Sequence, residues 1–241
     1  MNSQRRPVGA QSIKPILFRL DKFTATAWFI GIVWIAVVAW VAINKYYSLE
    51  AGYDLAVFNQ LFWNTMNGRL LENSSPWLQP YFGTHFAPLL LLLTPIYSIY
   101  PSPVWLIVMQ SIALGIVGPL LFLIGRSIGL NALLAVSLGL AYLLHPSIQG
   151  AALDDFHSVS FAPLFLSAAI LCMTKNRRRW IWFWLVLLAC VREDMALLAA
   201  MAAFAWWLQK PGERSRLIPA LCLALYGIFV LFIWMPALRV G

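Results

Sequence analysis

Long apolar runs without charge are the feature of this sequence that most restricts its fold. Segments Thr24–Ile43, Val104–Gly125 and Leu217–Met235 contain no charged side chain. Each is long enough to cross a hydrocarbon core of roughly 30 Å, which takes about 20 helical residues. The whole chain is 61% hydrophobic and 11% charged, whereas soluble domains carry about 25% charged residues. The sequence therefore predicts an integral membrane protein.

Seven such runs predict an all-α polytopic membrane protein with about seven transmembrane helices. They cover residues 24–43, 104–125, 130–145, 159–174, 180–191, 195–208 and 217–236. No internal repeat divides them, so residues 24–241 form a single transmembrane domain behind a basic N-terminal segment, residues 1–23. The net charge of +8 comes from Lys and Arg between the runs, where they set topology. The bilayer is thus the expected partner, and nucleic acid is not.

The segment 86–100, FAPLLLLLTPIYSIY, decides the topology. As a helix it would rise only about 22 Å, and Pro88 and Pro95 interrupt it. If it lies at the outer interface and the N-terminus is cytoplasmic, 13 of the 17 Lys and Arg residues are inside, and if it spans, only 7 are. The bias of Lys and Arg toward the cytoplasm selects the first arrangement, with the N-terminus inside. We expect the chain to lie in the cell (inner) membrane. The outer loop 44–103 then carries amphipathic interfacial helices.

This topology gathers most titratable groups on the outer face. Only two of the nine acidic residues stay inside. The outer acids are Glu50, Asp54, Glu72, Asp154, Asp155, Glu193 and Asp194, and the histidines His85, His145 and His157 join them. Four separate loops therefore bring acids or imidazoles to one side of the membrane.

The segment 52–68, GYDLAVFNQLFWNTMNG, has the pattern of an interfacial amphipathic helix. Leu55, Phe58, Phe62 and Met66 follow helical spacing on one face, and Gln60, Asn64 and Asn67 follow it on another. Asp54 stands at the start. It either caps the helix by accepting backbone N–H bonds or presents its carboxylate as a base or metal ligand.

Two further outer segments carry candidate site residues. His85 precedes the apolar stretch and is by itself either an interfacial side chain or part of a site. In the loop 145–160, Asp154, Asp155 and His157 form a possible metal- or phosphate-handling cluster. The alternative is capping, in which Asp155 or Ser158 begins the next helix.

The most informative feature is Arg192-Glu193-Asp194, which lies between apolar half-segments of only 12 and 14 residues. If both cross the membrane, their junction is recessed into the outer leaflet, where ionisable groups are costly and indicate function. The alternative is an Arg192–Glu193 ion pair with Asp194 capping the next helix. Three consecutive side chains point about 100° apart on a helix, so the three charges cannot all take part in one ion pair.

Charge balance on the outer face favours a divalent cation. Seven acids there oppose only Lys45, Arg69, Arg192 and Arg239, so a phosphate ligand would be repelled without a cation. Carboxylate oxygens suit Mg²⁺ or Mn²⁺. No Walker-type loop, HExxH or GxSxG motif supports nucleotide hydrolysis, zinc proteolysis or serine-hydrolase chemistry.

The motifs GYDLAVFNQ, THFAPLLLLLTPIY, LDDFH and VREDMAL, in this order, resemble an uncharacterised family of predicted membrane proteins, domain of unknown function 2079. Its layout is similar to the GT-C superfamily of membrane glycosyltransferases. That resemblance implies an acid in the first outer loop, interfacial helices, polyprenyl-phosphate sugar donors and, in many members, a divalent metal. Asn59 stands where family members often have an acidic residue, and Arg192 stands where Lys is usual. The resemblance also implies that this chain is truncated relative to the family.

These observations together predict a membrane glycosyltransferase-like protein with a polyprenyl-phosphate-linked sugar donor. We expect Asp54, Glu193 and Asp194 to be catalytic. We expect substrate to be bound by His85, Arg192, Tyr53 and Gln60. We expect a divalent cation, Mg or Mn, to be bound by Asp155, His157 and Asp154. A transporter with a recessed charged cluster predicts acids near the midplane and a cavity that opens to both sides. A non-catalytic scaffold predicts that every charge is a cap or an ion pair.

Overall fold

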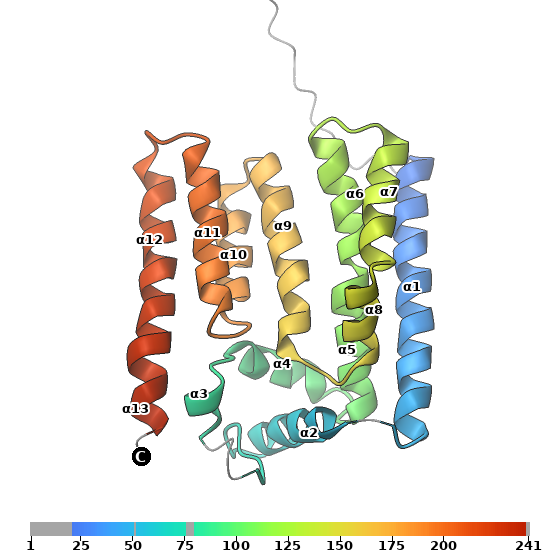
Figure 1. Ribbon diagram of the computed structural model, residues 1–241, viewed down its shortest axis with the longest axis vertical. Coiled ribbons are helices and arrows are strands. Elements are labelled where there is room, and N and C mark those ends of the chain that lie inside the picture. The colour runs from blue at the N-terminus through green and yellow to red at the C-terminus, as the bar shows by residue number, and fades with distance from the viewer. Residues whose placement is uncertain (1–20, 51, 76–79, 240–241) are drawn as a thin grey trace, which may run out of the picture.

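The computed structural model describes residues 21–50, 52–75 and 80–239, and this part of the chain is helical without strands. Figure 1 shows the helices in chain order. They are α1 (Lys22–Tyr47), α2 (Tyr53–Met66), α3 (Tyr81–Thr84), α4 (Leu89–Tyr97), α5 (Pro103–Gly115), α6 (Val117–Ser127), α7 (Ala132–Leu143), α8 (Pro146–Leu153), the 3₁₀ turn η2 (Ser158–Phe161), α9 (Ala162–Thr174), α10 (Arg178–Ala189), α11 (Met195–Leu208), α12 (Arg214–Phe229), the π-helical turn η3 (Val230–Trp234) and α13 (Met235–Arg239). The all-α prediction is confirmed.

The long helices form two groups that stand side by side. One group contains α1 and α5–α8, the other contains α9–α13, and α6 packs against α9 between them. Close backbone approach holds α6 to α7, since a Cβ on Gly139 would lie 2.6 Å from the carbonyl oxygen of Gly118. Such small-residue contacts are typical of helices packed in a membrane.

The predicted number of seven spans is not confirmed. Three helical stretches in the described residues are long and apolar enough to cross a membrane, Lys22–Tyr47, Pro103–Ser127 and Arg214–Arg239. A fourth is possible if the bent pair α7 and α8 forms one span. The runs at 159–174, 180–191 and 195–208 are helical as expected, but α10 and α11 have only 12 and 14 residues.

The bend between α7 and α8 corrects the expected place of His145. The chain turns by 48° here, because Pro146 begins a new helix and His145 becomes its N-cap, accepting from the Ser147 N–H at 3.2 Å. The bend lies beside the middle of α1, where the Trp34 indole donates to the carbonyl of Leu143 at 2.9 Å. His145 is therefore not at the end of the bundle with the other histidines.

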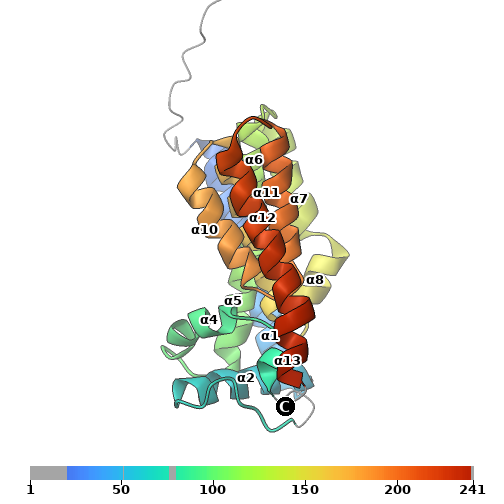
Figure 2. The ribbon, with the colours of Figure 1, turned by 90° about the vertical axis from the view of Figure 1, so that its left-hand side faces the viewer.

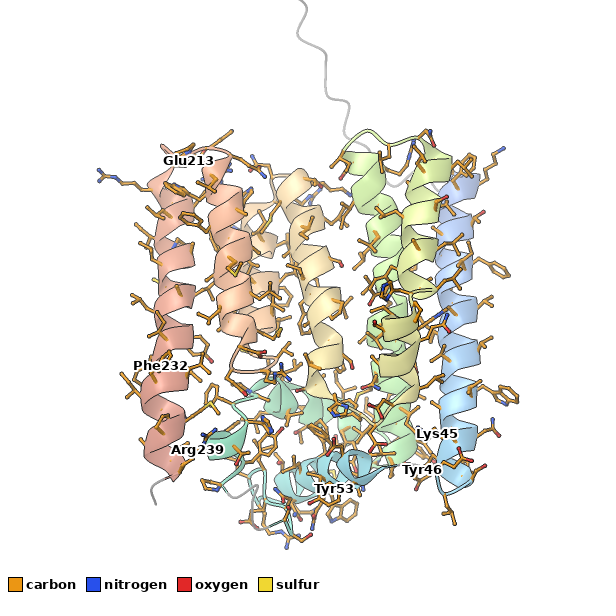
Figure 3. All side chains as sticks on the ribbon, viewed as in Figure 1. Lys45, Tyr46, Tyr53, Glu213, Phe232 and Arg239 are labelled. Atoms are coloured by element: carbon orange, nitrogen blue, oxygen red, sulfur yellow. The ribbon has the colours of Figure 1, made fainter. Side chains whose placement is uncertain are left out.

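The basic loops and the acidic loops lie at opposite ends of the bundle. The first residue of α1, Arg126 and the loops 175–179 and 210–216 lie at one end, which we call the basic end. There Glu213 pairs with Arg178 and accepts from Arg216 Nε at 2.9 Å. Helices α2–α4 lie at the other end, and Figure 3 shows Glu213 and Tyr53 at these opposite ends. The separation matches the one expected from the sequence, while the assignment of the basic end to the cytoplasm stays a prediction.

Apolar side chains cover the outside of the bundle between these ends. Phe29 and Trp40 of α1 are each 67% exposed, and Phe232 is 73% exposed. Figure 3 shows Phe232 pointing away from the helices. Exposure of large apolar side chains over the length of a bundle is what lipid contact requires, in agreement with an integral membrane protein.

The segment 86–100 forms only the nine-residue helix α4, which packs against α2 and is not among the candidate spans. Figures 1 and 2 show α2, α3 and α4 below the ends of α10 and α11. Leu89 and Leu90 are buried there, and the N–H of Leu89 donates to the carbonyl of Cys190 at 2.8 Å. Helices α10 and α11 are short because the α3–α4 segment occupies the space beneath their connecting turn.

Candidate functional site

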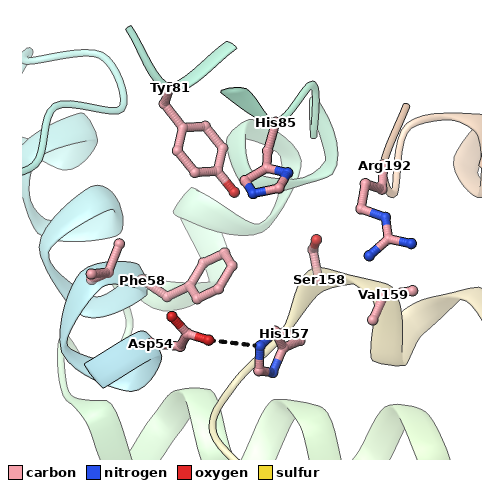
Figure 4. Close-up of a pocket in the computed structure, with 9 residues that line it drawn as sticks. Asp54, Phe58, Tyr81, His85, His157, Ser158, Val159 and Arg192 are labelled. Atoms are coloured by element: carbon pink, nitrogen blue, oxygen red, sulfur yellow. Dashed lines mark hydrogen bonds and ion pairs between the residues drawn. The ribbon is translucent and has the colours of Figure 1, made fainter. Parts of the chain in front are cut away.

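A pocket of about 250 Å³ opens where three distant segments meet beneath the bundle. These segments are the first two turns of α2, the region around α3 and the loop that leads into α9, and a fourth segment, the α10–α11 turn, completes the wall. Its lining, shown in Figure 4, consists of Asp54, Val57, Phe58, Tyr81, His85, His157, Ser158, Val159 and Arg192. The pocket therefore combines one carboxylate, three cationic or potentially cationic groups, two hydroxyls and an apolar wall.

Asp155, which precedes α9, caps α2 from a distant part of the chain. Its Oδ1 accepts the Gly52 N–H at 2.8 Å, and its Oδ2 accepts the Leu55 N–H at 3.2 Å. Gly52 is the N-cap residue of α2, and a Cβ at this position would lie 2.4 Å from the Asp155 carboxylate. The buried carboxylate thus satisfies N–H groups that a helix leaves free at its start.

This cap excludes both local capping alternatives. Asp54 lies in the first turn of α2 and makes no cap bond, and η2 begins without a side-chain cap from Asp155 or Ser158. Since Asp155 caps α2, the carboxylate of Asp54 turns into the pocket.

Asp54 faces His157 across the pocket. Asp54 Oδ2 lies 3.0 Å from His157 Nε2, and a dashed line marks this contact in Figure 4. The other ring nitrogen, Nδ1, lies 2.9 Å from the carbonyl oxygen of Asp155. A carbonyl oxygen only accepts hydrogen bonds, so Nδ1 carries a proton. A second proton is then shared between His157 Nε2 and the Asp54 carboxylate.

The Arg192-Glu193-Asp194 triplet does not form the Arg192–Glu193 ion pair of the alternative interpretation. Arg192 pairs with Asp194, not with Glu193, through Nε to Oδ1 at 2.8 Å and Nη2 to Oδ2 at 2.5 Å. The hydrogen bonds from Arg192 hold the pKa of Asp194 below its usual value. The remaining N–H groups of the guanidinium are left for the pocket that Arg192 lines. Asp194 is the N-cap residue of α11 but makes no side-chain cap bond.

Glu193 connects the α10–α11 turn to the segment before α4. Its Oε2 accepts the Phe86 N–H at 3.0 Å, and its Oε1 lies 3.5 Å from His85 Nδ1. Burial acts to raise the pKa of Glu193, but the His85 side chain and backbone N–H groups outweigh burial, and the pKa is lower than usual. Glu193 therefore holds His85 at the edge of the pocket.

The lowered pKa predicts an acid-sensitive contact between these two segments. A carboxylate with a depressed pKa stabilises the folded state fully above the unfolded pKa, about 4.3 for Glu, and this contribution is lost as the pH falls through the folded value. We expect the protection of the Phe86 amide against hydrogen exchange, relative to its intrinsic rate, to fall over that acidic range. Glu193→Gln should remove this pH dependence, and an unchanged profile in Glu193→Gln would contradict the assignment.

Sequence reasoning missed Tyr81 and Gln110. Tyr81 is buried and lines the pocket, and burial, with the charges of Glu193 and Asp54, raises the pKa of its phenol well above the usual value. Gln110 lies in α5 and donates to three backbone carbonyls of the loop before His157. The available signal was a single amide in the apolar run 104–125.

Six predicted site residues lie outside the pocket lining: Glu193, Asp194 and Asp155, whose contacts are described above, and Tyr53, Gln60 and Asp154. Tyr53 is 59% exposed on α2, and Gln60 Oε1 accepts from the backbone and hydroxyl of Ser74. Asp154 is exposed and lies with Lys45 at a different, smaller hollow. The pocket thus takes in Asp54, His85, His157 and Arg192 from the predicted set.

The expected cation ligands do not converge. Both oxygens of Asp155 accept backbone N–H groups, Asp154 lies elsewhere, and His157 bonds to Asp54. Among the described residues no group of three or more His, Cys, Asp or Glu side chains is placed to hold a metal ion. A divalent cation stays a prediction, and nothing below depends on it.

Comparison with known proteins gives one match. The sequence model of a family described as predicted membrane protein (DUF2079) matches residues 45–239. No curated protein and no solved structure matches the chain.

Proposed function

The chain belongs to the predicted membrane protein family DUF2079, and we propose that it is a glycosyltransferase-like enzyme with a polyprenyl-phosphate-linked sugar as donor. The observation that carries the proposal is the pocket itself, in which the Asp54–His157 pair and Arg192 line one cavity. A sugar-transfer site needs a base for an acceptor hydroxyl and positive groups for a phosphate leaving group. Both are present.

Asp54 is the proposed base. His157 holds one carboxylate oxygen, Oδ2, at 3.0 Å, which leaves Oδ1 for an acceptor hydroxyl. As the hydroxyl oxygen bonds to the anomeric carbon, its proton passes to Asp54. The bond from that carbon to the donor phosphate oxygen breaks, and polyprenyl phosphate departs.

Arg192 and His85 are the proposed phosphate-binding groups. Asp194 fixes the guanidinium through two hydrogen bonds, and Glu193 lies beside the His85 ring. Each of these two side chains is thus oriented by an acid of the α10–α11 turn before any ligand binds. Such preorganised charge is what stabilises a developing phosphate charge most effectively. The Tyr81 and Ser158 hydroxyls supply polar contacts beside the apolar Phe58 and Val159.

Binding of polyprenyl phosphate to Arg192→Gln tests this proposal. The substitution removes a charge-assisted hydrogen bond to phosphate, worth about 1.5–3 kcal/mol, so we expect about a tenfold or larger loss of affinity. The measurement is titration of purified protein in nanodiscs with fluorescent polyprenyl phosphate.

Arg69→Gln is the matched control. It also removes one arginine at the end that carries α2, but Arg69 bonds to Asn64 and does not line the pocket. The affinity of Arg69→Gln for polyprenyl phosphate should equal that of the unaltered chain. Equal affinities for Arg192→Gln and the unaltered chain, or no binding to either, would overturn the proposed donor.

A further inference from the structure

Gln110 is a buried amide in the middle of α5, a helix whose other residues are apolar except for Ser111. It is 1% exposed and lies on the side of α5 that faces the loop between α8 and η2. Its side-chain Nε2 donates to the carbonyls of Ala151 at 2.9 Å and Asp155 at 3.1 Å, with that of Asp154 at 3.4 Å. Its Oε1 accepts the His157 N–H at 2.8 Å. One side-chain amide therefore provides hydrogen-bond partners for backbone groups at both ends of this loop.

The Asp155 carbonyl connects this amide to the His157 ring. The same oxygen accepts from Gln110 Nε2 at 3.1 Å and from His157 Nδ1 at 2.9 Å. A carbonyl oxygen held in that place can only accept a hydrogen bond from a protonated Nδ1, and Nε2 is then directed to Asp54. The partner of one imidazole nitrogen determines what the other can do.

We propose that Gln110 is a positioning residue that fixes the Nδ1-protonated form of His157 and so directs Nε2 toward Asp54. The inference about the protonation of the His157 ring depends on the hydrogen bonds alone. Its consequence for catalysis rests on the proposed function. Gln110 touches neither the pocket nor a substrate, and it acts through the loop backbone.

The state of the ring can be measured by ¹⁵N NMR on histidine-labelled protein in nanodiscs. The chain contains three histidines, and His157→Asn assigns the relevant signals. In the unaltered protein we expect Nδ1 of His157 to be protonated. A bare Nδ1 in the unaltered protein would overturn the proposal without the need for any variant.

Two substitutions then test the role of the amide. Gln110→Met removes donor and acceptor at similar length, and Gln110→Glu keeps the shape and the acceptor but loses the donor. Both should take the proton from Nδ1 in part of the population, which leaves rings that are protonated at Nε2 alone. Ser111→Ala, a buried neighbour whose hydroxyl bonds within α5, should leave the ring signals unchanged. Folded Gln110 variants with the ring signals of the unaltered protein would contradict the proposal.

A kinetic readout separates this inference from the proposed function. If sugar transfer is measurable, Gln110→Glu should lower kcat by about 10–100-fold, as loss of an orienting partner does, with donor affinity unchanged. If the ring changes its protonation but the unaltered chain transfers no sugar, the positioning role holds and the proposed function does not. If kcat stays unchanged in a variant whose ring has changed, the catalytic consequence is wrong.

Discussion

Asp54→Asn should lower the rate of sugar transfer by about 10²–10⁴-fold, the contribution of a positioned general base. The amide has the size of the carboxylate and keeps an oxygen near His157, but it cannot take a proton from the acceptor hydroxyl. Donor binding should change little, because the proposed phosphate contacts come from Arg192 and His85 on the other side of the pocket.

The measurement is turnover of a radiolabelled polyprenyl-phosphate sugar in proteoliposomes. Glu72→Gln is the control, since it removes an exposed carboxylate that follows α2 and lies outside the pocket lining. Thermal unfolding in detergent checks that each variant is folded. Turnover of Asp54→Asn at the level of Glu72→Gln would remove Asp54 from the chemistry.

Asp155→Ala should have the largest effect on stability. Two N–H groups at the start of α2 lose their acceptor. Loss of a helix cap costs about 0.5–2 kcal/mol, and a buried donor left without a partner costs about 1–3 kcal/mol. We expect a lower unfolding midpoint and faster hydrogen exchange at Gly52 and Leu55, because α2 loses its connection to the loop before α9.

Asp154→Ala is the neighbouring control, since Asp154 is exposed and makes no side-chain bond to α2. Gly52→Ala provides a second route to the same defect, because the new Cβ would lie 2.4 Å from the Asp155 carboxylate. Gly52→Ala should therefore also expose the start of α2 to exchange. Exchange at these amides that is equal in Asp155→Ala and Asp154→Ala would contradict the cap.

The sequence was sufficient for features that depend on local pattern. The apolar runs are helical, and the spacing of Leu55, Phe58, Phe62 and Met66 predicted an amphipathic helix. Leu55, Phe58 and Phe62 are buried as expected, and Met66 is only partly buried. The short segments around Arg192 predicted a turn recessed into the outer leaflet. In the structure α3 and α4 lie beneath this turn, and its depth in a membrane stays a prediction. Asn64 is an exception on α2, because it is buried and donates to the carbonyl of Glu72.

The partners of the polar groups could not be predicted from the sequence, because they are separated by long stretches of chain. Capping rules consider the residues adjacent to a helix, yet the cap of α2 comes from Asp155. Sequence proximity also made Arg192–Glu193 the ion pair of the alternative interpretation, whereas the turn brings Asp194 to Arg192 and leaves Glu193 for Phe86. Hydropathy located the runs but could not give the helix lengths, which depend on what packs beneath them.

The account depends most on Asp54 and His157 acting as one unit in a shared pocket, and a double-mutant cycle on sugar transfer tests this most directly. The variants are Asp54→Asn, His157→Gln and the combination of the two. Groups in direct contact show coupling of about 0.5–3 kcal/mol, so the combined variant should be little slower than Asp54→Asn alone. Rate losses that multiply would show that the two side chains act independently, and this would contradict the account.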